Sequence, residues 1–318
     1  MKPLGIGLVG LGRWGRNYAK TLLALPECRL VAAADSNAAA RTRSERETGT
    51  VTHETIAELL SNPAIEALVI ATPDHTHFSL AAAALKAGRD VLVEKPMALE
   101  PQEAEALAAQ AEAGGRVLAV GHTAVHHPGF PALMDAVAAG PLHTVWSASA
   151  VRTSSGYVDG RSNPILDLCP HDLAMAVLLF GTPVAARARS RMSGVEYEVR
   201  FEGNALLNGR AEWQTPPHTR RFEVAGANSR TGLSDPVPDV RHSSRDVRNS
   251  PLGRECLDFT ECCRTRRQPL SNGRLGVEVT RCLAALTASC ADSNAWVPLA
   301  GLVHRWPQQP LSDRTEVA

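Results

Sequence analysis

Two residues in the second half of the chain could together transfer a proton. Asp167 and His171 are four positions apart, so on a helix the carboxylate and the imidazole lie on one face. A carboxylate beside an imidazole fixes its tautomer and raises its basicity. The structural alternative is that Asp167 caps a helix beginning around Pro170, with His171 as an ordinary helix residue. The spacing alone leaves both interpretations open.

The residues around Lys95 restrict the direction of its side chain. Lys95 follows the apolar run 90–93, and Pro96 restricts it to extended geometry. The alternative, a solvated surface lysine, is disfavoured by a position directly after a predicted buried strand. We therefore expect the ammonium group of Lys95 to belong to a site.

A glycine-rich turn near the start of the chain could bind phosphates. It follows an apolar run and precedes a helical pattern. In this order Gly10 permits a tight turn, Gly12 leaves the backbone open to a pyrophosphate, and Gly15 lets the helix pack closely on the sheet. A lone motif of this kind also arises by chance, so its context must support it. The residues of this turn predicted to contact a dinucleotide are Gly10, Gly12, Arg13, Trp14 and Gly15.

The supporting context is an acidic residue 20 positions after the last glycine of the turn, at the end of the second strand-like run. The carboxylate of Asp35 can accept hydrogen bonds from the adenosine ribose and would repel a 2′-phosphate, which favours NAD over NADP. Asp35 and the adjacent Ser36 are therefore predicted to bind the cofactor. The competing interpretation is that Asp35 caps the helix that follows. Arg41 and Arg43 in that helix keep NADP as the minor alternative.

Alternating strand-like and helix-like segments up to residue 120 must position these groups. Fully apolar strands indicate a sheet buried on both faces, and the alternation predicts a doubly wound parallel sheet. Ligands bind such a sheet beyond the carboxyl ends of its strands. The expected strands are 4–9, 29–34, 51–53, 67–71, 90–93 and 117–120, and the expected helices are 14–25, 38–48, 55–61, 77–87 and 101–113.

Three polar clusters follow strands of this predicted sheet and should face the glycine turn. One contains Thr72, Pro73 and His77, the second contains Lys95, and the third contains His122. For His77, helix capping and turn formation compete evenly with ligand contact.

The pattern changes beyond residue 122. Strands then follow one another without intervening helices, which predicts a mostly antiparallel sheet, open on one face. We predict an NAD(P)-binding domain over 1–122 and an α/β domain for substrate and oligomer contacts over 123–318, with a long loop at 227–254 and a frayed tail from Pro307. The expected strands are 144–151, 195–201, 205–213 and 221–224, and the expected helices are 131–139, 165–180, 255–266 and 276–290.

The composition excludes several classes of protein. A length of 318 residues suggests two domains, and a net formal charge of +0 argues against nucleic-acid and membrane-surface partners. No apolar run is long enough to span a membrane, and the N-terminus enters a strand too soon for a signal peptide. The 7 cysteines form no CxxC pair, so we expect buried structural thiols, no metal site and a cytoplasmic location.

Four motifs in order, Gly10-x-Gly12-x-x-Gly15, Ala71-Thr72-Pro73, Glu94-Lys95-Pro96 and Asp167-x-x-x-His171, resemble the Gfo/Idh/MocA oxidoreductase family. The segment 163–172 resembles members similar to UDP-N-acetylglucosaminuronate 3-dehydrogenase. The resemblance covers nearly the whole chain. It implies a Rossmann domain followed by an α/β domain whose open sheet commonly serves oligomer contacts, here in a homodimer or homotetramer.

The resemblance also implies the chemistry, a hydride transfer between NAD(H) and a sugar hydroxyl or keto group, which includes nucleotide-linked sugars. Lys95 would bond the reacting oxygen, His171 would act as general base or acid, and Asp167 would orient or share its proton. The Lys95–Pro96 peptide is often cis in such proteins. The implied cofactor contacts are Thr72, Pro73, His77, Glu94 and Lys95, and the predicted substrate contacts are Lys95, His122, Asn163, Asp167 and His171.

Departures from the family pattern keep alternatives open. Leu166 and Ala124-Val125 stand where the family often has aromatic or arginine side chains, which either enlarges the pocket or marks lost activity. One alternative is a glycosidase of the same fold that uses tightly held NAD⁺. Another is a sensor that binds NAD(H) without catalysis, against which the Asp167 and His171 pair argues mildly. The sugar, the carbon and the reaction direction do not follow from the residues.

Overall fold

The computed structural model describes residues 2–139, 145–155, 163–214, 216–226, 230–235 and 246–300. The described residues form two compact units. The first contains those up to Thr123 and those from 246 to 276, and the second contains those from 124 to 235 and from 277 onward. The second division falls within the helix α10 (Gly273–Ala291).

The first unit is built on the predicted parallel sheet, whose strand order is β3-β2-β1-β4-β5-β6. The order reverses between β1 and β4, and ligands of such sheets bind beyond the carboxyl ends of the strands at this switch point. The central strands are buried throughout, which explains their unbroken apolar sequences. The strands are β1 (Leu4–Val9), β2 (Cys28–Ala34), β3 (Thr52–His53), β4 (Ala67–Ile70), β5 (Asp90–Val93) and β6 (Leu118–Val120).

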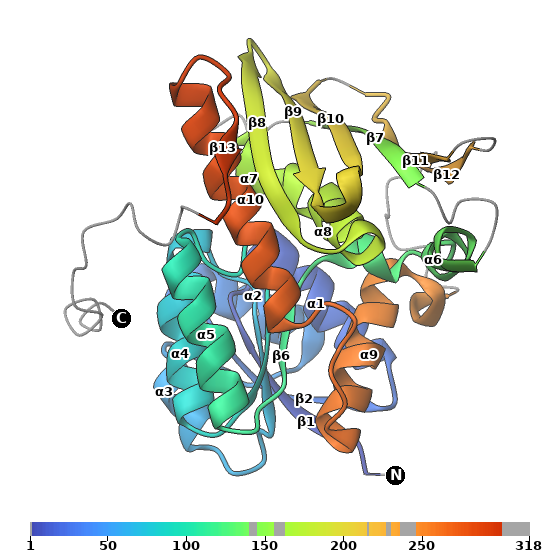
Figure 1. The fold of residues 1–318 in the computed structure, drawn as a ribbon. Helices are drawn as coiled ribbons and strands as arrows, with labels where there is room; N and C mark the ends of the chain where they lie inside the picture. The colour runs from blue at the N-terminus through green and yellow to red at the C-terminus, as the bar shows by residue number, and fades with distance from the viewer. Residues whose placement is uncertain are drawn as a thin grey trace. The chain divides into compact units, whose positions relative to one another are not determined.

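Helices cover both faces of this sheet, with α3, α4 and α5 on one side and α1 on the other (Figure 1). Their ends follow local capping chemistry. The Asn37 side chain accepts hydrogen bonds from two amides at the start of α2, and Thr55 with Glu58 forms a capping box on α3. The bounds are α1 (Arg13–Ala24), α2 (Ala38–Thr48), α3 (Ile56–Ser61), η1 (Asp74–Thr76), α4 (His77–Lys86), α5 (Pro101–Ala113) and η2 (Thr123–His126).

Helix α9 (Pro251–Thr265) corrects the predicted domain division, because it packs with the first unit although it lies in the range 123–318. Phe259 and three buried cysteines of α9 join the core beneath α1 and β1. At the C-terminal end of α9, Arg266 donates to the buried carboxylate of Asp90 at 2.8 and 2.9 Å. The apolar face of α9 therefore completes the Rossmann core.

The predicted loop over 227–254 is wrong in part. It contains the strand β12 (Arg230–Asp235), the short helix η4 (Val247–Asn249) and the start of α9 at Pro251. The side chain of Ser250 accepts a hydrogen bond from the amide of Gly253 and caps α9. Residues 227–229 and 236–245 of that range, and the tail from Pro307, lie outside the described residues.

The second unit contains a mixed, mostly antiparallel sheet in the order β12-β11-β7-β10-β9-β8-β13. Only β7 and β10 pair in parallel among these strands. The prediction missed β8, whose inward residues Ala186 and Ala188 are too weakly apolar to mark a strand. The bounds are β7 (Val145–Ser154), β8 (Pro183–Arg191), β9 (Gly194–Phe201), η3 (Glu202–Asn204), β10 (Leu206–Trp213), β11 (Arg220–Gly226) and β13 (Val297–Pro298).

The helices of the second unit are α6 (Phe130–Ala139), α7 (Pro164–Asp167) and α8 (Cys169–Phe180). The helix predicted over 165–180 is therefore divided at Leu168, which keeps α-helical dihedral angles. Helix α7 contacts β9 and β10, and α8 contacts β7 and β10. The sheet thus fixes the direction in which this helical segment runs.

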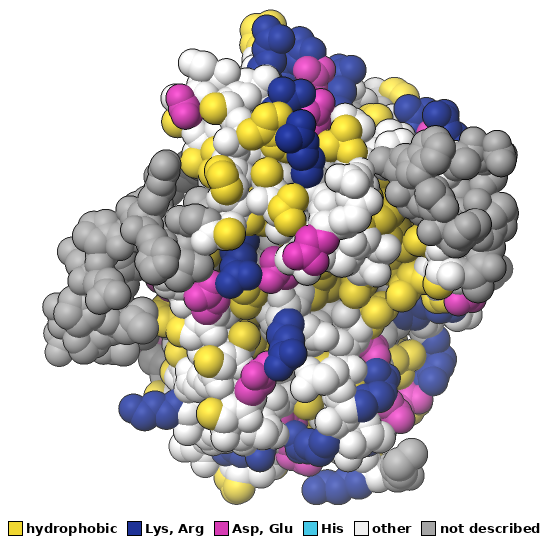
Figure 2. All heavy atoms as spheres, viewed as in Figure 1, with side chains coloured by type: hydrophobic (Ala, Val, Ile, Leu, Met, Phe, Trp, Pro, Cys, Tyr) yellow, Lys and Arg dark blue, Asp and Glu magenta, His cyan; other side chains and the backbone are white. Residues whose placement is uncertain are grey.

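The surface in view carries charges of both signs, and the cysteines are free thiols. Figure 2 shows Lys and Arg side chains interspersed with Asp and Glu over the face in view. All 7 cysteines are free, as expected of structural thiols, and burial raises the pKa of Cys262 to about 12. None of the described helices is both long and apolar enough to cross a membrane.

Candidate cofactor and catalytic site

The glycine turn between β1 and α1 has the geometry that its sequence predicts. Gly10 has a φ of +92°, and a Cβ on Gly15 would lie 1.9 Å from the Gly10 carbonyl oxygen. A Cβ on Gly12 would meet no atom within 4 Å. Gly12 is also the N-cap of α1, and no side chain caps this helix. The first amides of α1 are therefore left to an anion such as a pyrophosphate.

Two of the predicted contacts begin the helix itself. Arg13 is the first residue of α1, and Trp14 is 39% exposed. A large aromatic side chain left in solvent beside a phosphate-binding turn is consistent with its predicted role against the cofactor.

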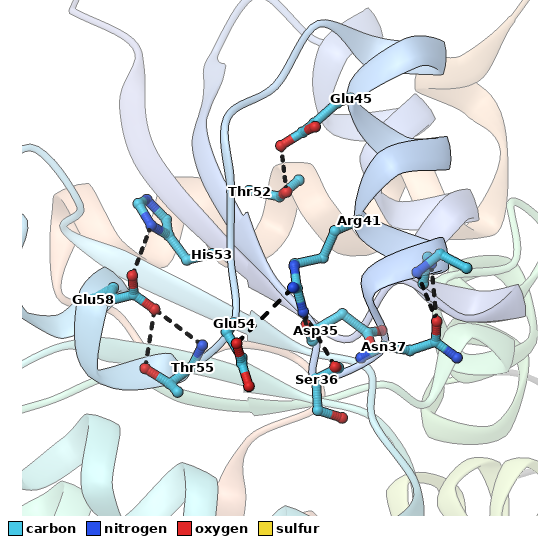
Figure 3. Close-up of polar contacts among 12 residues, drawn as sticks. Asp35, Ser36, Asn37, Arg41, Glu45, Thr52, His53, Glu54, Thr55 and Glu58 are labelled. Carbon is cyan, nitrogen blue, oxygen red and sulfur yellow. Dashed lines mark hydrogen bonds and ion pairs between the residues drawn. The ribbon is translucent and has the colours of Figure 1, made fainter.

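Asp35 is tied to the glycine turn through both carboxylate oxygens. Oδ2 accepts a hydrogen bond from the Leu11 amide at 2.7 Å, and Oδ1 accepts one from the Asn37 amide at 2.8 Å (Figure 3). The capping interpretation of Asp35 is wrong, since the side chain of Asn37 caps α2. Each carboxylate oxygen keeps a lone pair for a ribose hydroxyl. Ser36, the next predicted contact, is exposed.

His77 joins the loops that follow β4 and β5. Its Nδ1 lies 2.7 Å from the carbonyl oxygen of Pro96, and its Nε2 lies 2.9 Å from that of Thr72. Burial lowers the pKa of His77, and a neutral imidazole has only one N–H to donate. The geometry assigns this ring to loop positioning. In the same loop, the Thr76 hydroxyl donates to the carbonyl of Pro73 at 2.6 Å.

The turn after β5 holds Lys95 with its backbone fixed. The Lys95–Pro96 peptide is cis, as the resemblance implied, and the Lys95 side chain is buried. The amide of Lys95 donates to Oε2 of Glu94 at 3.1 Å. Glu94 therefore orients the backbone at the position of the predicted catalytic ammonium.

A buried cluster behind Glu94 was not predicted. The Tyr18 hydroxyl lies 3.0 Å from Oε1 of Glu94 and 3.0 Å from Oε2 of Glu255 in α9. A phenol has one proton, so one contact needs a protonated carboxyl group. Burial raises the pKa of Glu255 well above its ordinary value, which favours the neutral form of this carboxyl group. In that form Glu255 can donate to the Tyr18 oxygen, which leaves the phenol proton for Glu94.

His122, a predicted substrate contact, is fully buried after β6. Its Nδ1 lies 3.0 Å from the Ser271 hydroxyl. The ring is thus held by the segment that precedes α10.

In the second unit, the predicted pair lies on adjoining turns. Asp167 is the last residue of α7, and His171 lies in the first turn of α8. No side chain caps α8, so the interpretation of Asp167 as its cap is not observed. Asn163, another predicted contact, caps α7 by accepting from the Ile165 amide at 2.9 Å.

Asp172, next to His171, is an anchor that the sequence reasoning did not identify. Its buried carboxylate accepts from Nη2 of Arg152 at 2.6 Å and from Nε at 3.1 and 3.2 Å. The Tyr197 hydroxyl donates to the same group at 3.3 Å. The first turn of α8 is therefore bonded to β7 and β9, which fixes the position of His171 on the sheet.

The predicted residues fall into two groups, one in each unit. The first group follows strands β1, β2, β4, β5 and β6 at one edge of the parallel sheet, as the switch-point rule requires. It contains Gly10, Gly12, Arg13, Trp14, Gly15, Asp35, Ser36, Thr72, Pro73, His77, Glu94, Lys95 and His122, and the second group contains Asn163, Asp167 and His171.

Residues 4–122 match the family model described as an oxidoreductase family with an NAD-binding Rossmann fold. The first unit is therefore similar to the Rossmann domain of the Gfo/Idh/MocA oxidoreductases. The match agrees with the resemblance of the motifs and with an NAD-binding Rossmann fold in this part of the chain.

The curated relatives include dehydrogenases. UDP-N-acetylglucosamine 3-dehydrogenase of Acidithiobacillus ferrooxidans is 33% identical over 184 residues, which cover 57% of this chain and 56% of the relative. Inositol 2-dehydrogenase 1 of Saccharopolyspora erythraea is 32% identical over 141 residues, or 43% and 42% of the two chains. The chain thus spans only about half the length of the curated relatives that it matches.

Solved structures share the fold over nearly the whole chain. GenD2 from gentamicin A biosynthesis, in complex with NAD, has a TM-score of 0.85 at 24% identity and covers 94% of this chain and 97% of its own. WlbA of Bordetella pertussis, in complex with NADH and UDP-GlcNAcA, has a TM-score of 0.81 at 20% identity, with 93% and 98% covered. The two-unit architecture is therefore that of these proteins.

Proposed function

We propose that the protein is an NAD(H)-dependent oxidoreductase that transfers a hydride between nicotinamide and a sugar hydroxyl or keto group. The observation that carries the proposal is the Glu94–Lys95–Pro96 turn, where a buried lysine follows β5 at the same sheet edge as the glycine turn. A surface role would leave that ammonium in water. A buried cation there suits an oxygen that develops negative charge.

The proposed reaction needs a hydride acceptor, a base and a group that holds the reacting oxygen. Removing a hydride from a carbinol carbon requires the hydroxyl proton to leave, and a positioned base contributes roughly 10²–10⁴-fold to the rate. Bound NAD would supply the hydride acceptor. In this proposal Lys95 holds the reacting oxygen, His171 accepts the proton at its imidazole, and Asp167 orients that ring.

The cofactor of the proposed reaction is NAD rather than NADP. Asp35 is held by the amides of Leu11 and Asn37, so its carboxylate cannot easily turn away from a 2′-phosphate. The ribose diol, by contrast, can donate to the remaining lone pairs.

The proposed substrate class is a cyclic secondary alcohol. Two curated relatives are named as dehydrogenases of UDP-N-acetylglucosamine and of inositol, and both of these compounds carry hydroxyl groups on a ring. A nucleotide-linked sugar is the more specific proposal, supported by the segment 163–172 and its resemblance.

A substrate scan tests the function. The purified chain is mixed with NAD⁺ and with separate sugar nucleotides, free sugars and inositols, and the absorbance of reduced nicotinamide is followed. On the substrate found, Lys95→Met and His171→Asn should each lower kcat by roughly 10²–10⁴-fold, and His171→Asn should leave the Kd for NADH unchanged. The exposed residues Lys86 and His75 provide the matched controls Lys86→Met and His75→Asn. Wild-type turnover by both site variants would refute the assignment.

A further inference from the structure

A cation and an anion flank the backbone of Asp35 and Ser36. Nη1 of Arg41 donates to the Asp35 carbonyl at 2.8 Å and to the Ser36 carbonyl at 3.1 Å. Nη2 of Arg41 lies 3.9 Å from Oε2 of Glu54. Figure 3 shows the guanidinium between Glu54 and the Asp35–Ser36 segment. The side chain of Arg41 is 21% exposed and that of Glu54 is 70% exposed.

The backbone fixes where these groups lie. Strands β2 and β3 pair in parallel with Ala34 opposite His53, and the Asp35 amide donates to the His53 carbonyl at 3.2 Å. Glu54 is therefore the first residue beyond β3, beside the first residue beyond β2. The pair stands at the end of the strand where Asp35 would receive the adenosine ribose.

This arrangement contains the parts of a 2′-phosphate site. An arginine near the end of β2 accommodates the 2′-phosphate in NADP-binding Rossmann domains. Here Arg41 supplies the guanidinium and Ser36 supplies an exposed hydroxyl. The carboxylate of Glu54 lies 3.9 Å from Nη2 of Arg41, the nitrogen that a phosphate would otherwise approach.

We propose that Ser36 and Arg41 form a latent site for the 2′-phosphate of NADP(H), and that Glu54 closes it by pairing with Arg41. Glu54 is then a second determinant of cofactor choice besides Asp35. The inference rests on the proposed function in one respect, the binding of the dinucleotide at the glycine turn.

The two determinants differ in strength. The pair is long and solvent-exposed on the side of Glu54, and such pairs are weak. Asp35 carries its charge where the phosphate must approach and is held in place by two amides. Loss of Glu54 should therefore raise NADPH affinity by about threefold, within the range of a surface ion pair, and should leave NADH affinity unchanged.

Cofactor binding tests the proposal without knowledge of the substrate. The full chain is titrated with NADPH and with NADH, with nicotinamide fluorescence as the readout, at low and high salt. Glu54→Gln should tighten NADPH about threefold, and high salt should reduce the gain. Arg41→Gln added to Glu54→Gln should remove the gain. The same variants are also made in the Asp35→Ser background, in which NADPH should bind more tightly, so that changes in its affinity are easier to measure.

Two matched controls separate the pair from general charge effects. Glu45 lies in α2 and accepts a hydrogen bond from the Thr52 hydroxyl at 2.5 Å, so Glu45→Gln removes an equal charge nearby. Arg46 is an exposed arginine of α2, which gives Arg46→Gln. Neither variant should alter the ratio of NADPH to NADH affinity.

The outcomes are distinguishable. If Glu45→Gln and Glu54→Gln change NADPH binding equally, or if the gain survives loss of Arg41, the latent site is refuted while NADH binding still supports the proposed function. If the wild-type chain binds neither dinucleotide, the proposed function fails and this inference fails with it.

Discussion

The hydroxyl of Tyr18 in α1 lies 3.0 Å from Oε1 of Glu94, the residue that precedes the proposed catalytic lysine. Glu255 of α9 contacts the same hydroxyl, and its second oxygen, Oε1, is buried without a hydrogen-bond partner. Three buried polar groups thus connect a helix from the end of the Rossmann unit to the Lys95 turn. A charged Glu255 would compete with Glu94 for the single proton of Tyr18, so both contacts can be hydrogen bonds only when one carboxyl group is protonated.

Glu255→Gln should change the pH dependence of stability. The folded-state pKa of Glu255 is raised, chiefly by burial. Its contribution to the unfolding free energy is therefore fully present below the unfolded pKa of about 4.3 and is lost as the pH rises through the folded-state pKa. Glutamine does not titrate. The unfolding free energy of the variant relative to that of the wild type should therefore increase as the pH rises above about 5. Urea denaturation at several pH values measures the difference, and a constant difference would contradict a neutral Glu255.

His77 should produce the opposite trend at low pH. Its folded-state pKa is lowered by burial and by the charge of Lys95, although two carbonyls and Asp74 favour the proton. Near pH 6.5 the unfolded chain therefore binds a proton at His77 that the folded chain does not bind. The contribution of His77 to the unfolding free energy is fully present above that pH and is lost as the pH falls.

His77→Gln tests this trend, because it keeps one donor for a carbonyl and removes the titration. The wild type should lose more unfolding free energy than the variant between about pH 7 and about pH 5, by about 1.4 kcal/mol per unit of pKa depression. His75→Gln, at an exposed position, serves as the control. Parallel pH profiles for wild type and His77→Gln would show that the ring is not buried as a neutral group.

The sequence predicted the Rossmann sheet well because its central strands are short apolar runs, buried on both faces, and because Asp35 follows one of them. It could not predict the Tyr18–Glu255 contact, which joins positions 237 residues apart. A glutamate on the apolar face of α9, beside Cys256 and Phe259, is the one signal that could have suggested a buried acid.

The second unit was harder to predict for a different reason. Alanine supplies the inward side chains of β8, and the polar β12 lies at an edge of the sheet, so neither strand has a strong apolar alternation. The spacing of Asp167 and His171 predicted a shared helical face, and the two residues lie at the end of α7 and in the first turn of α8. It could not show that Asp172 and Arg152 hold that turn on the sheet.

The glycine turn offers a matched pair of substitutions. A Cβ on Gly12 meets nothing within 4 Å, so Gly12→Ala should preserve the folded state and lower NADH affinity by at least about tenfold, because the methyl group stands where the pyrophosphate approaches. A Cβ on Gly15 collides with the Gly10 carbonyl, so Gly15→Ala should lower the unfolding midpoint itself. Thermal denaturation and NADH titration separate the two effects, and normal NADH binding by folded Gly12→Ala would place the cofactor elsewhere.

Asp172→Asn should be among the most destabilising single changes in the second unit. It leaves the guanidinium of Arg152 buried without its anion, and breaking a buried pair in this way costs about 3–5 kcal/mol. Tyr197→Phe removes only one long hydrogen bond of 3.3 Å and should cost about 1 kcal/mol. Glu196→Gln breaks the exposed ion pair with Arg191 in the same sheet and should change stability by less than about 1 kcal/mol. Urea denaturation of the three variants gives this order directly. If Asp172→Asn were no more costly than Glu196→Gln, the Arg152–Asp172 pair would not anchor α8, and the position of His171 would have to depend on the apolar contacts of that helix alone.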